Sequence, residues 1–229
     1  DDVTQAAAGD ITSTSGTIDV LAVSGAISMN DGAVTATTDK DIRLVAGTDV
    51  TLGSLTAGTG SVSVIAGESI LDGGDTDVDV IADGLRLVSG GNIGSATESL
   101  DTTINVLSAT AGGLISVDET AAVVIDAVTV TISRVSDTGE VADVVDAAQS
   151  DLTAVGAILL SSTAGDITIN DGDTDGLGLS SGGVTRVIAE SGSVLINSGV
   201  KATNAISISA ADDVTQAAAG DITSTSGTI

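Results

Sequence analysis

Alternating acidic residues in the segment 170–176 form the strongest candidate site in this sequence. Asp171, Asp173 and Asp175, followed by Gly176, match the first half of a calcium-binding loop, in which alternate carboxylates converge on a hard cation. The match is incomplete, because Gly182 stands where such a loop carries a bidentate Glu. Asp-Gly pairs also favour tight turns that need no ion. Calcium binding and a plain turn are therefore both open interpretations.

A second acidic cluster lies in "LDGGDTDVDV". It has a similar alternation and offers three further candidate ligands, Asp72, Asp75 and Asp77, followed by Asp79. The related phrase Asn30-Asp31-Gly32 is expected to be a turn, since Asp-Gly pairs suit the left-handed backbone of tight corners. Ca²⁺ is the one cofactor that these acidic segments suggest.

Catalytic constellations find little support in this composition. The chain has no His and no Cys, which excludes Ser-His-Asp and Cys-His nucleophiles. Carboxylate pairs could cleave a polysaccharide, but no aromatic residue exists to form a sugar platform. We therefore expect a protein that is not an enzyme, with a carbohydrate-active enzyme as a distant alternative.

The net charge of −26 comes from 32 acidic residues against six Lys and Arg. Phosphate binding needs a basic face, so a nucleic-acid partner is excluded. No segment resembles a membrane span or a signal peptide. A surface this acidic is expected to attract cations, and divalent cations could bundle such molecules side by side.

The first eighteen residues, "DDVTQAAAGDITSTSGTI", recur without change at 212–229. A cloning overlap would give the same identity, but a fixed period is the mark of tandem arrays. We predict one repeat unit at 1–211 and the start of the next identical unit at 212–229. Without the three acids of the second copy, a unit carries 29 acids and six bases, or −23. Spread over roughly nine coils, or about 43 Å, the net charge of a unit gives about one negative charge every 2 Å of length. This linear charge density is similar to that of duplex DNA.

A shorter period runs inside the unit. Apolar-x-apolar runs end at Gly, Ser or Asp corners and are followed by a second short β-type run, which indicates short strands. The first apolar positions of these runs are Ile18, Ile42, Val62, Leu85, Ile104, Ile158, Val184, Ile206 and Ile229. A coil of 20–25 residues buries its apolar face only by stacking on others. The pattern predicts an all-β fold, a parallel β-helix (β-solenoid) of about nine to ten coils. Two β-sandwich modules are the competing fold, but they would need bulky core residues that are missing here.

One region breaks this rhythm between residues 113 and 156. There "AAVVIDAVTVTI" gives a longer strand-like run. It is followed by a segment in which Val141, Val144, Val145, Ala148 and Leu152 have helical spacing. We expect a short helix or an irregular excursion near 139–152.

The phrases "AAGDITSTSG", "AGTDVTLGS", "STAGDITIND" and "AADDVTQAA" resemble the repeats of filamentous-haemagglutinin-type large exoproteins. The similarity is one of repetitive style and covers most of the chain outside 113–156. Proteins of that family are secreted bacterial adhesins built as long right-handed parallel β-helices. The resemblance implies export and an extracellular or cell-surface location.

Strand alternation also places a set of polar side chains on the outside of the coils. Asp19, Arg43, Arg86 and Arg186 lie inside the first strand of their coils, and alternation is expected to turn them outward. Stacking would set Asp19 beside Arg43 on the neighbouring coil as a cross-strand pair.

These features together predict a structural protein, a secreted acidic fibre or biofilm-matrix component made of tandem β-solenoid units. Its main partner would be itself, through a continuous chain of units or through end-to-end stacking of separate chains. The stalk of an adhesin, with its binding tip elsewhere, is the alternative.

Overall fold

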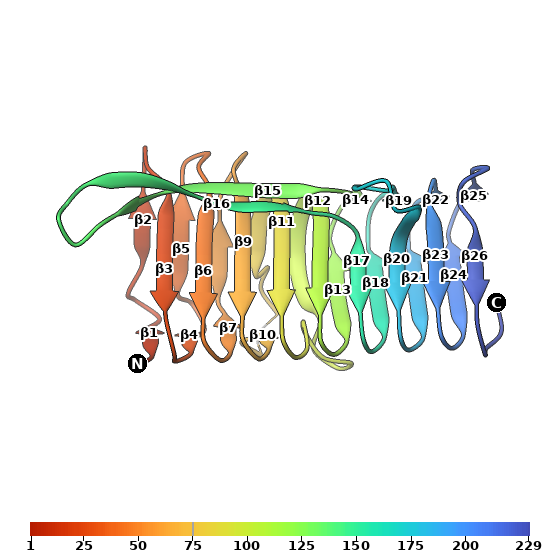
Figure 1. The fold of residues 1–229 in the computed structure, drawn as a ribbon, viewed down its shortest axis with the longest axis horizontal. Helices are drawn as coiled ribbons and strands as arrows, with labels where there is room; N and C mark the ends of the chain where they lie inside the picture. The colour runs from red at the N-terminus through yellow and green to blue at the C-terminus, as the bar shows by residue number, and fades with distance from the viewer. Residues whose placement is uncertain (75) are drawn as a thin grey trace.

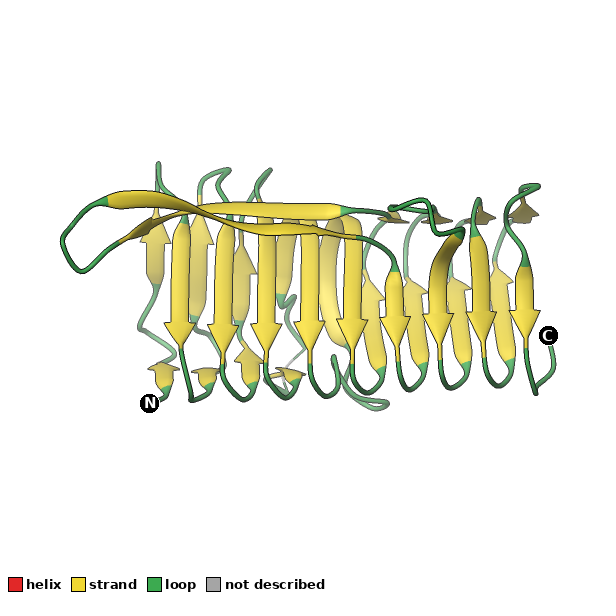
Figure 2. Cartoon of the chain, in the orientation of Figure 1, coloured by secondary structure: helices red, strands yellow, loops and turns green. Residues whose placement is uncertain are grey.

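The structure is a computed structural model that describes residues 1–74 and 76–229. The described residues form 26 β-strands and no helix. They wind into a parallel β-solenoid of about ten turns (Figures 1 and 2). The predicted all-β parallel β-helix is therefore confirmed.

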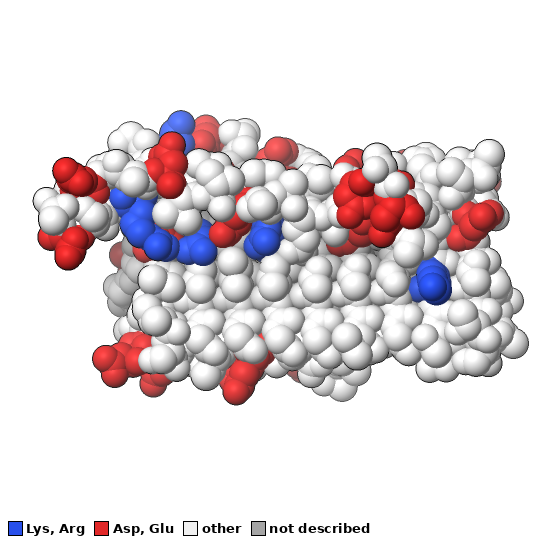
Figure 3. Space-filling view, viewed as in Figure 1, with Lys and Arg blue, Asp and Glu red and all other residues white. Residues whose placement is uncertain are grey.

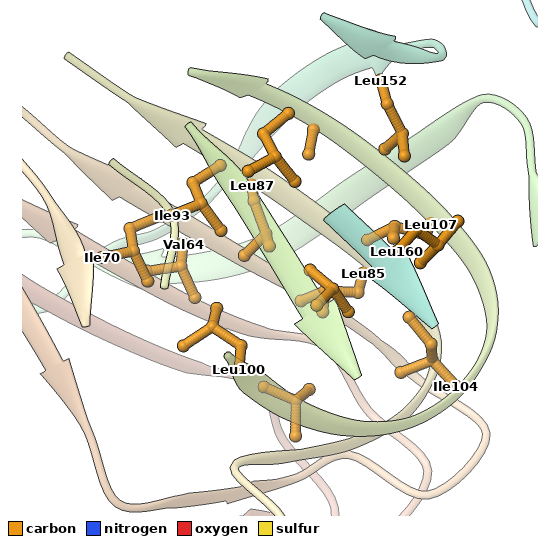
Figure 4. Packing of buried hydrophobic residues seen from close by; sticks show 14 of the residues in the cluster. Val64, Ile70, Leu85, Leu87, Ile93, Leu100, Ile104, Leu107, Leu152 and Leu160 are labelled. Carbon is orange, nitrogen blue, oxygen red and sulfur yellow. The ribbon is translucent and has the colours of Figure 1, made fainter. Parts of the chain in front are cut away.

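The strands form because apolar residues alternate with polar or small ones. In the strand Ile42–Ala46, the side chains of Ile42, Leu44 and Ala46 are buried, whereas Arg43 and Val45 point outward. Repeated in each coil, this alternation fills the interior with aliphatic side chains that meet from different sides of the coil (Figure 4). Val, Ile and Leu suffice for this interior because it is narrow.

The first coils have three sides, each a stack of parallel strands. The first stack consists of β1 (Val3–Gln5), β4 (Ile27–Met29), β7 (Val50–Leu52) and β10 (Ile70–Asp72), continued by Ile93. The second stack consists of β2 (Ile11–Ser13), β5 (Val34–Thr37), β8 (Ser54–Thr56) and the first halves of β11 (Val80–Ser89) and β12 (Leu100–Ala111). The third stack has the longest strands, β3 (Ile18–Ala22), β6 (Ile42–Ala46), β9 (Ser61–Ala66) and the second halves of β11 and β12.

The later coils continue the same ladder with a different division into sides. The long strands are now β13 (Ile115–Glu119), β18 (Ile158–Ser162), β21 (Thr185–Ala189) and β24 (Ile206–Ala210). A stack of short strands follows, made of β14 (Val123–Ile125), β19 (Ile167–Ile169), β22 (Val194–Ile196) and β25 (Val214–Gln216). The third side is formed by β17 (Leu152–Ala154), β20 (Leu177–Ser181), β23 (Gly199–Ala202) and β26 (Ile222–Ser224).

The change of sides takes place between β12 and β13. β13 continues the first stack at Ile115, which bridges to Ile93, and the second stack at Val117, which pairs with Leu100. The long third side is divided in turn, because β14 and β17 both pair with the second half of β12. The long side of the coil thus moves to another side of the solenoid halfway along the chain.

The second copy of the opening segment consequently lies on different sides from the first copy. Val3 pairs with Ile27 in the first stack, but its copy Val214 pairs with Val194 in the short-strand stack. Likewise β26, the copy of β2, pairs with β23. The backbone N–H of Ile206 donates to Thr228 O at 2.9 Å, so Ile229, the copy of Ile18, continues the stack of β24. Identical sequence at the two ends therefore does not mean an identical position around the axis.

A column of glycines forms the corner after the long strands of the early coils. At Gly67, Gly90 and Gly112, an added Cβ would fall too close to the carbonyl oxygen of the glycine one coil before. The backbones of neighbouring coils approach so closely at this corner that no side chain fits.

The break in the rhythm is a β-hairpin, β15 (Val128–Val135) paired antiparallel with β16 (Val141–Gln149). It leaves the solenoid after β14 and runs back along the third stack, across β12, β11, β9, β6 and β3 (Figure 1). The predicted excursion is confirmed, but a helix at 139–152 is wrong. The valines of this segment satisfy their backbone groups by pairing with β15, and the turn uses Gly139 at a φ of 81°.

Candidate functional site

The predicted acidic loop gathers its three carboxylates and adds a fourth. Oxygen atoms of Asp151, Asp171, Asp173 and Asp175 all lie within 4.8 Å of one another. The loop connects β19 to β20, and Asp151 comes from the residue before β17 on the preceding coil. Four converging carboxylates are the donor set that Ca²⁺ prefers.

Backbone N–H groups hold this loop in shape. Asp171 accepts hydrogen bonds from the N–H of Thr174 at 2.6 Å and of Gly176 at 2.9 Å. Asp151 accepts one from the N–H of Gly172 at 3.1 Å, which ties the two coils together. Burial alone would raise the pKa of Asp171, but these N–H donors together lower it below its ordinary value.

Asp151 is the functional candidate that the sequence did not indicate. It lies twenty residues before Asp171, outside the alternating motif, and reaches the loop only through the stacking of neighbouring coils. Burial is the main cause that raises the pKa of Asp151, and the charges of Asp173 and Asp175 add to it. Its left-handed backbone, with a φ of 63°, is the one unusual local feature, and an Asp tolerates that conformation well.

Only two of the three predicted ligands of the second acidic cluster, Asp72 and Asp77, lie in the described part of the chain. Asp75 lies outside the described residues, and Asp72 accepts a hydrogen bond from the N–H of Gly74 in a local turn. Asp77 is exposed, whereas Asp79 is buried and accepts a hydrogen bond from the N–H of Asp101 on the next coil. Asp72 and Asp77 do not join a group of three or more converging ligands among the described residues. The phrase Asn30-Asp31-Gly32 is a turn, as expected, with Gly32 at a φ of 81°.

The interface between the hairpin and the early coils is the most extensive feature outside the solenoid itself. Val128, Val130 and Ile132 of β15 are buried and pack with Val106 and Val144. Hydrogen bonds then tie the hairpin to successive coils along the axis. The donors and acceptors are Ser133 N–H to Thr17 Oγ1 at 2.8 Å, Thr131 N–H to Asp41 Oδ2 at 2.9 Å, and Gln149 Nε2 to Leu87 O at 2.9 Å.

A charged network lies beneath this hairpin. Arg43 donates to Asp19 at 3.3 Å and to Asp146 of the hairpin at 2.8 Å, and Arg134 of the hairpin donates to Asp19 at 2.6 Å. The Asp19–Arg43 cross-strand pair that stacking predicts is thus confirmed in register and in contact. Only 11% of the Arg43 side chain is exposed. Burial alone would raise the pKa of Asp146, but hydrogen bonds from Arg43 and Ser63 and the charges of Arg43 and Arg86 lower it.

Charge is unevenly distributed on the surface. On the face shown in Figure 3, charged side chains gather at the hairpin and the acidic loop along one edge and at the turns of the opposite edge. The band between these edges is largely uncharged. The acidic character of the chain therefore resides mainly in corners and loops, where carboxylates keep their water.

Comparison with protein-family models gave no match, and neither did comparison with curated proteins or with solved structures. The likeness to filamentous-haemagglutinin-type exoproteins stays a resemblance of sequence style. No helix that could cross a membrane occurs in residues 1–74 and 76–229.

Proposed function

We propose that this is a structural protein whose 211-residue β-solenoid units stack in tandem into a long, acidic extracellular fibre. The observation that carries this proposal is the place of the second copy. Residues 212–229 form ordinary solenoid strands, with β25 paired to β22 and β26 paired to β23. This pairing supports a next unit that starts within the same ladder, since residues 212–229 continue the stacks of the preceding coil.

The two ends of the solenoid are consistent with further stacking. At the C-terminal end, Ile206, Ile208 and Ile222 line an open hollow of about 330 Å³ that a further coil would cover. At the N-terminal end, Val3, Ile11 and Val20 are only partly buried against the core. A further coil stacked at either end would bury these residues.

The mechanism of such a fibre is mechanical and electrostatic. Parallel main-chain ladders carry its length, and the carboxylates of its corners and loops hold water and cations. Export to the cell surface or the extracellular space belongs to the same proposal, as the resemblance to secreted exoproteins implies. An adhesin stalk would use the same shaft and differ from a matrix fibre by a distinct tip.

Electron microscopy tests the tandem arrangement. Chains with one, two and four units should form rods whose length grows by about 43 Å per unit, from nine coils spaced 4.8 Å apart. Beads on a flexible string, or rods of constant length, would overturn the proposal. Native material separates the two uses, since a fixed-length stalk with a tip would contradict the matrix fibre.

Calcium binding at the acidic loop is part of the proposed electrostatic role. Burial is the main cause that raises the pKa of Asp151, and the charges of Asp173 and Asp175 add a repulsion that a divalent cation would relieve. At a Ca²⁺ concentration of 100 times Kd, binding should stabilise the fold by about 2.7 kcal/mol. Asp151→Asn should remove most of this gain in thermal unfolding with Ca²⁺, whereas the control Asp31→Asn should keep it. Equal melting temperatures with Ca²⁺ and with a chelator would mean that the acidic loop is only a turn.

A further inference from the structure

The tip of the hairpin extends beyond the first coil and has no coil beneath it (Figures 1 and 2). The register pairs Val130 with Asp146, Ile132 with Val144 and Arg134 with Ala142 on the face toward the solenoid. We call this face the inner face, and alternation continues it to Ser136 and Glu140 at the tip. Where coils lie beneath the inner face, Val130, Ile132 and Asp146 are buried. Toward the tip, Ala142, Ser136 and Glu140 are exposed. The inner face thus becomes exposed where the coils beneath it end.

The C-terminal end indicates what would lie beneath the tip in a tandem array. Ile229, the copy of Ile18, continues the stack of β24. The strand β3 of a following unit would therefore stack on β24 of the preceding unit, and β24 itself stacks on β21. The stack of long strands that carries the hairpin would continue without a break across the unit boundary.

Charges along this continued stack match those of the inner face. In the described structure, acidic Asp146 meets Arg43, and basic Arg134 meets Asp19 one coil earlier. Continuing the column of Asp19 into the preceding unit gives Ser207 and then Arg186. The next charged residue of the inner face is Glu140. Arg186 is exposed and makes no ion pair with any described residue.

We propose that the hairpin tip of each unit docks on β24 and β21 of the preceding unit, with Glu140 paired to Arg186. This inference rests on the tandem stacking proposed above. The hairpin is then a clasp that braces five coils of its own unit and the last two coils of the unit before it. Because it spans the junction, it holds neighbouring units in one rotational setting.

The test uses a two-unit chain, residues 1–211 followed by residues 1–229. Ser209→Cys in the first unit and Leu21→Cys in the second form one reporter pair. Both are outward positions that would be direct neighbours at the junction, within the Cα separation that a disulfide needs. The chain has no other cysteine, so the disulfide reports the junction alone. Arg186→Lys in the first unit forms the second reporter, because a carbodiimide joins a lysine to a carboxylate that contacts it.

We expect the junction disulfide to form. We also expect mass spectrometry to find an amide between Lys at position 186 of the first unit and Glu140 of the second unit. Two control chains should lack this amide: the 229-residue chain with Arg186→Lys at the same concentration, and the two-unit chain in which Glu140→Gln is added in the second unit. As an internal control, the exposed Lys201 should form no amide with Glu140. A junction disulfide without the amide would overturn the docking and leave the tandem stacking intact. Failure of the disulfide would overturn the tandem stacking itself, and the docking with it, whatever the amide shows.

Discussion

The first five coils carry a second layer, the hairpin β15–β16, whereas the four later coils have no such layer among the described residues. In a plain solenoid each coil contacts only its neighbours, so stability is a sum of nearest-neighbour terms. The hairpin changes this for the early coils, because it bonds Thr17 of the first coil, Arg43 of the second and Leu87 of the fourth. The early half is therefore expected to open as one cooperative body, and the later half to fray coil by coil.

Removing the hairpin should abolish this difference and have the largest effect. An ideal Cβ on Gly172 would lie 2.7 Å from Ser150 Cβ and 2.8 Å from Ala127 N, so the two ends of the excursion are close. Replacement of 128–149 by two glycines should leave the solenoid folded. Amide exchange in β6 and β9 should become about a thousandfold faster, equivalent to about 4 kcal/mol, and approach that of β20 and β23. Unchanged protection in β6 and β9 would show that the hairpin is not a brace.

Arg43→Ala breaks the same brace at its charged centre. Two largely buried carboxylates, Asp19 and Asp146, would lose their shared partner, and breaking a buried ion pair costs about 3 kcal/mol. Urea unfolding measures this loss in the free energy of unfolding. The matched control in the later half is Lys201→Ala, an exposed cation whose removal should cost under about 0.5 kcal/mol. Equal losses from the two variants would contradict a structural role for the network.

The glycine corner gives a further contrast between the halves. Gly47, Gly67, Gly90 and Gly112 form this column in the early coils, whereas Val155 and Thr203 share the equivalent column of the later coils with Gly182. Gly90→Ala should cost about 2 kcal/mol, because its Cβ would meet the backbone of Gly67. Gly16→Ala, where only the flexible Ser13 side chain is near, is the control. Thermal unfolding of both variants checks this, and a neutral Gly90→Ala would mean that the corner has room.

The smallest effect concerns Glu119, at the junction between the halves. Burial is the main cause that raises its pKa, and it outweighs the hydrogen bonds from Thr102, Ala121, Ile104 and Thr120. A raised pKa means that the folded state favours the protonated acid. This stabilisation is fully present below the unfolded pKa of about 4.3 and is lost as the pH rises through the folded pKa.

Glu119→Gln should accordingly remove this pH dependence. Urea unfolding from pH 4 to pH 8 should show the wild type losing stability relative to the variant as the pH rises. The same substitution at the exposed Glu68 should not change with pH in this way. A constant difference between wild type and Glu119→Gln would contradict the raised pKa.

Much of the fold could be predicted from local pattern. Ile18, Ile42, Val62 and Leu85 share one stack as the period predicts, but the next member is Leu107 rather than Ile104. The valines at 141–145 satisfy a helical spacing and a strand pattern equally, and only pairing with β15 decides for the strand. In the acidic loop, the three alternating aspartates could be found from sequence because they are neighbours. Asp151 could not be found in this way, because it lies one coil earlier in the sequence and meets the loop only when the coils stack.

The sequence by itself determined a thin parallel β-solenoid, its Gly and Asp corners, and the Asp19–Arg43 ladder, because these depend on alternation within a strand and on one repeated stacking step. The tertiary structure alone decided where the hairpin lies, since its bonds to Thr17 and Asp41 span 116 and 90 residues and no period encodes them. It also decided that the long side moves around the axis between β12 and β13. That change depends on how β13, β14 and β17 pair with the coil before them, so two identical segments come to occupy different sides of one solenoid.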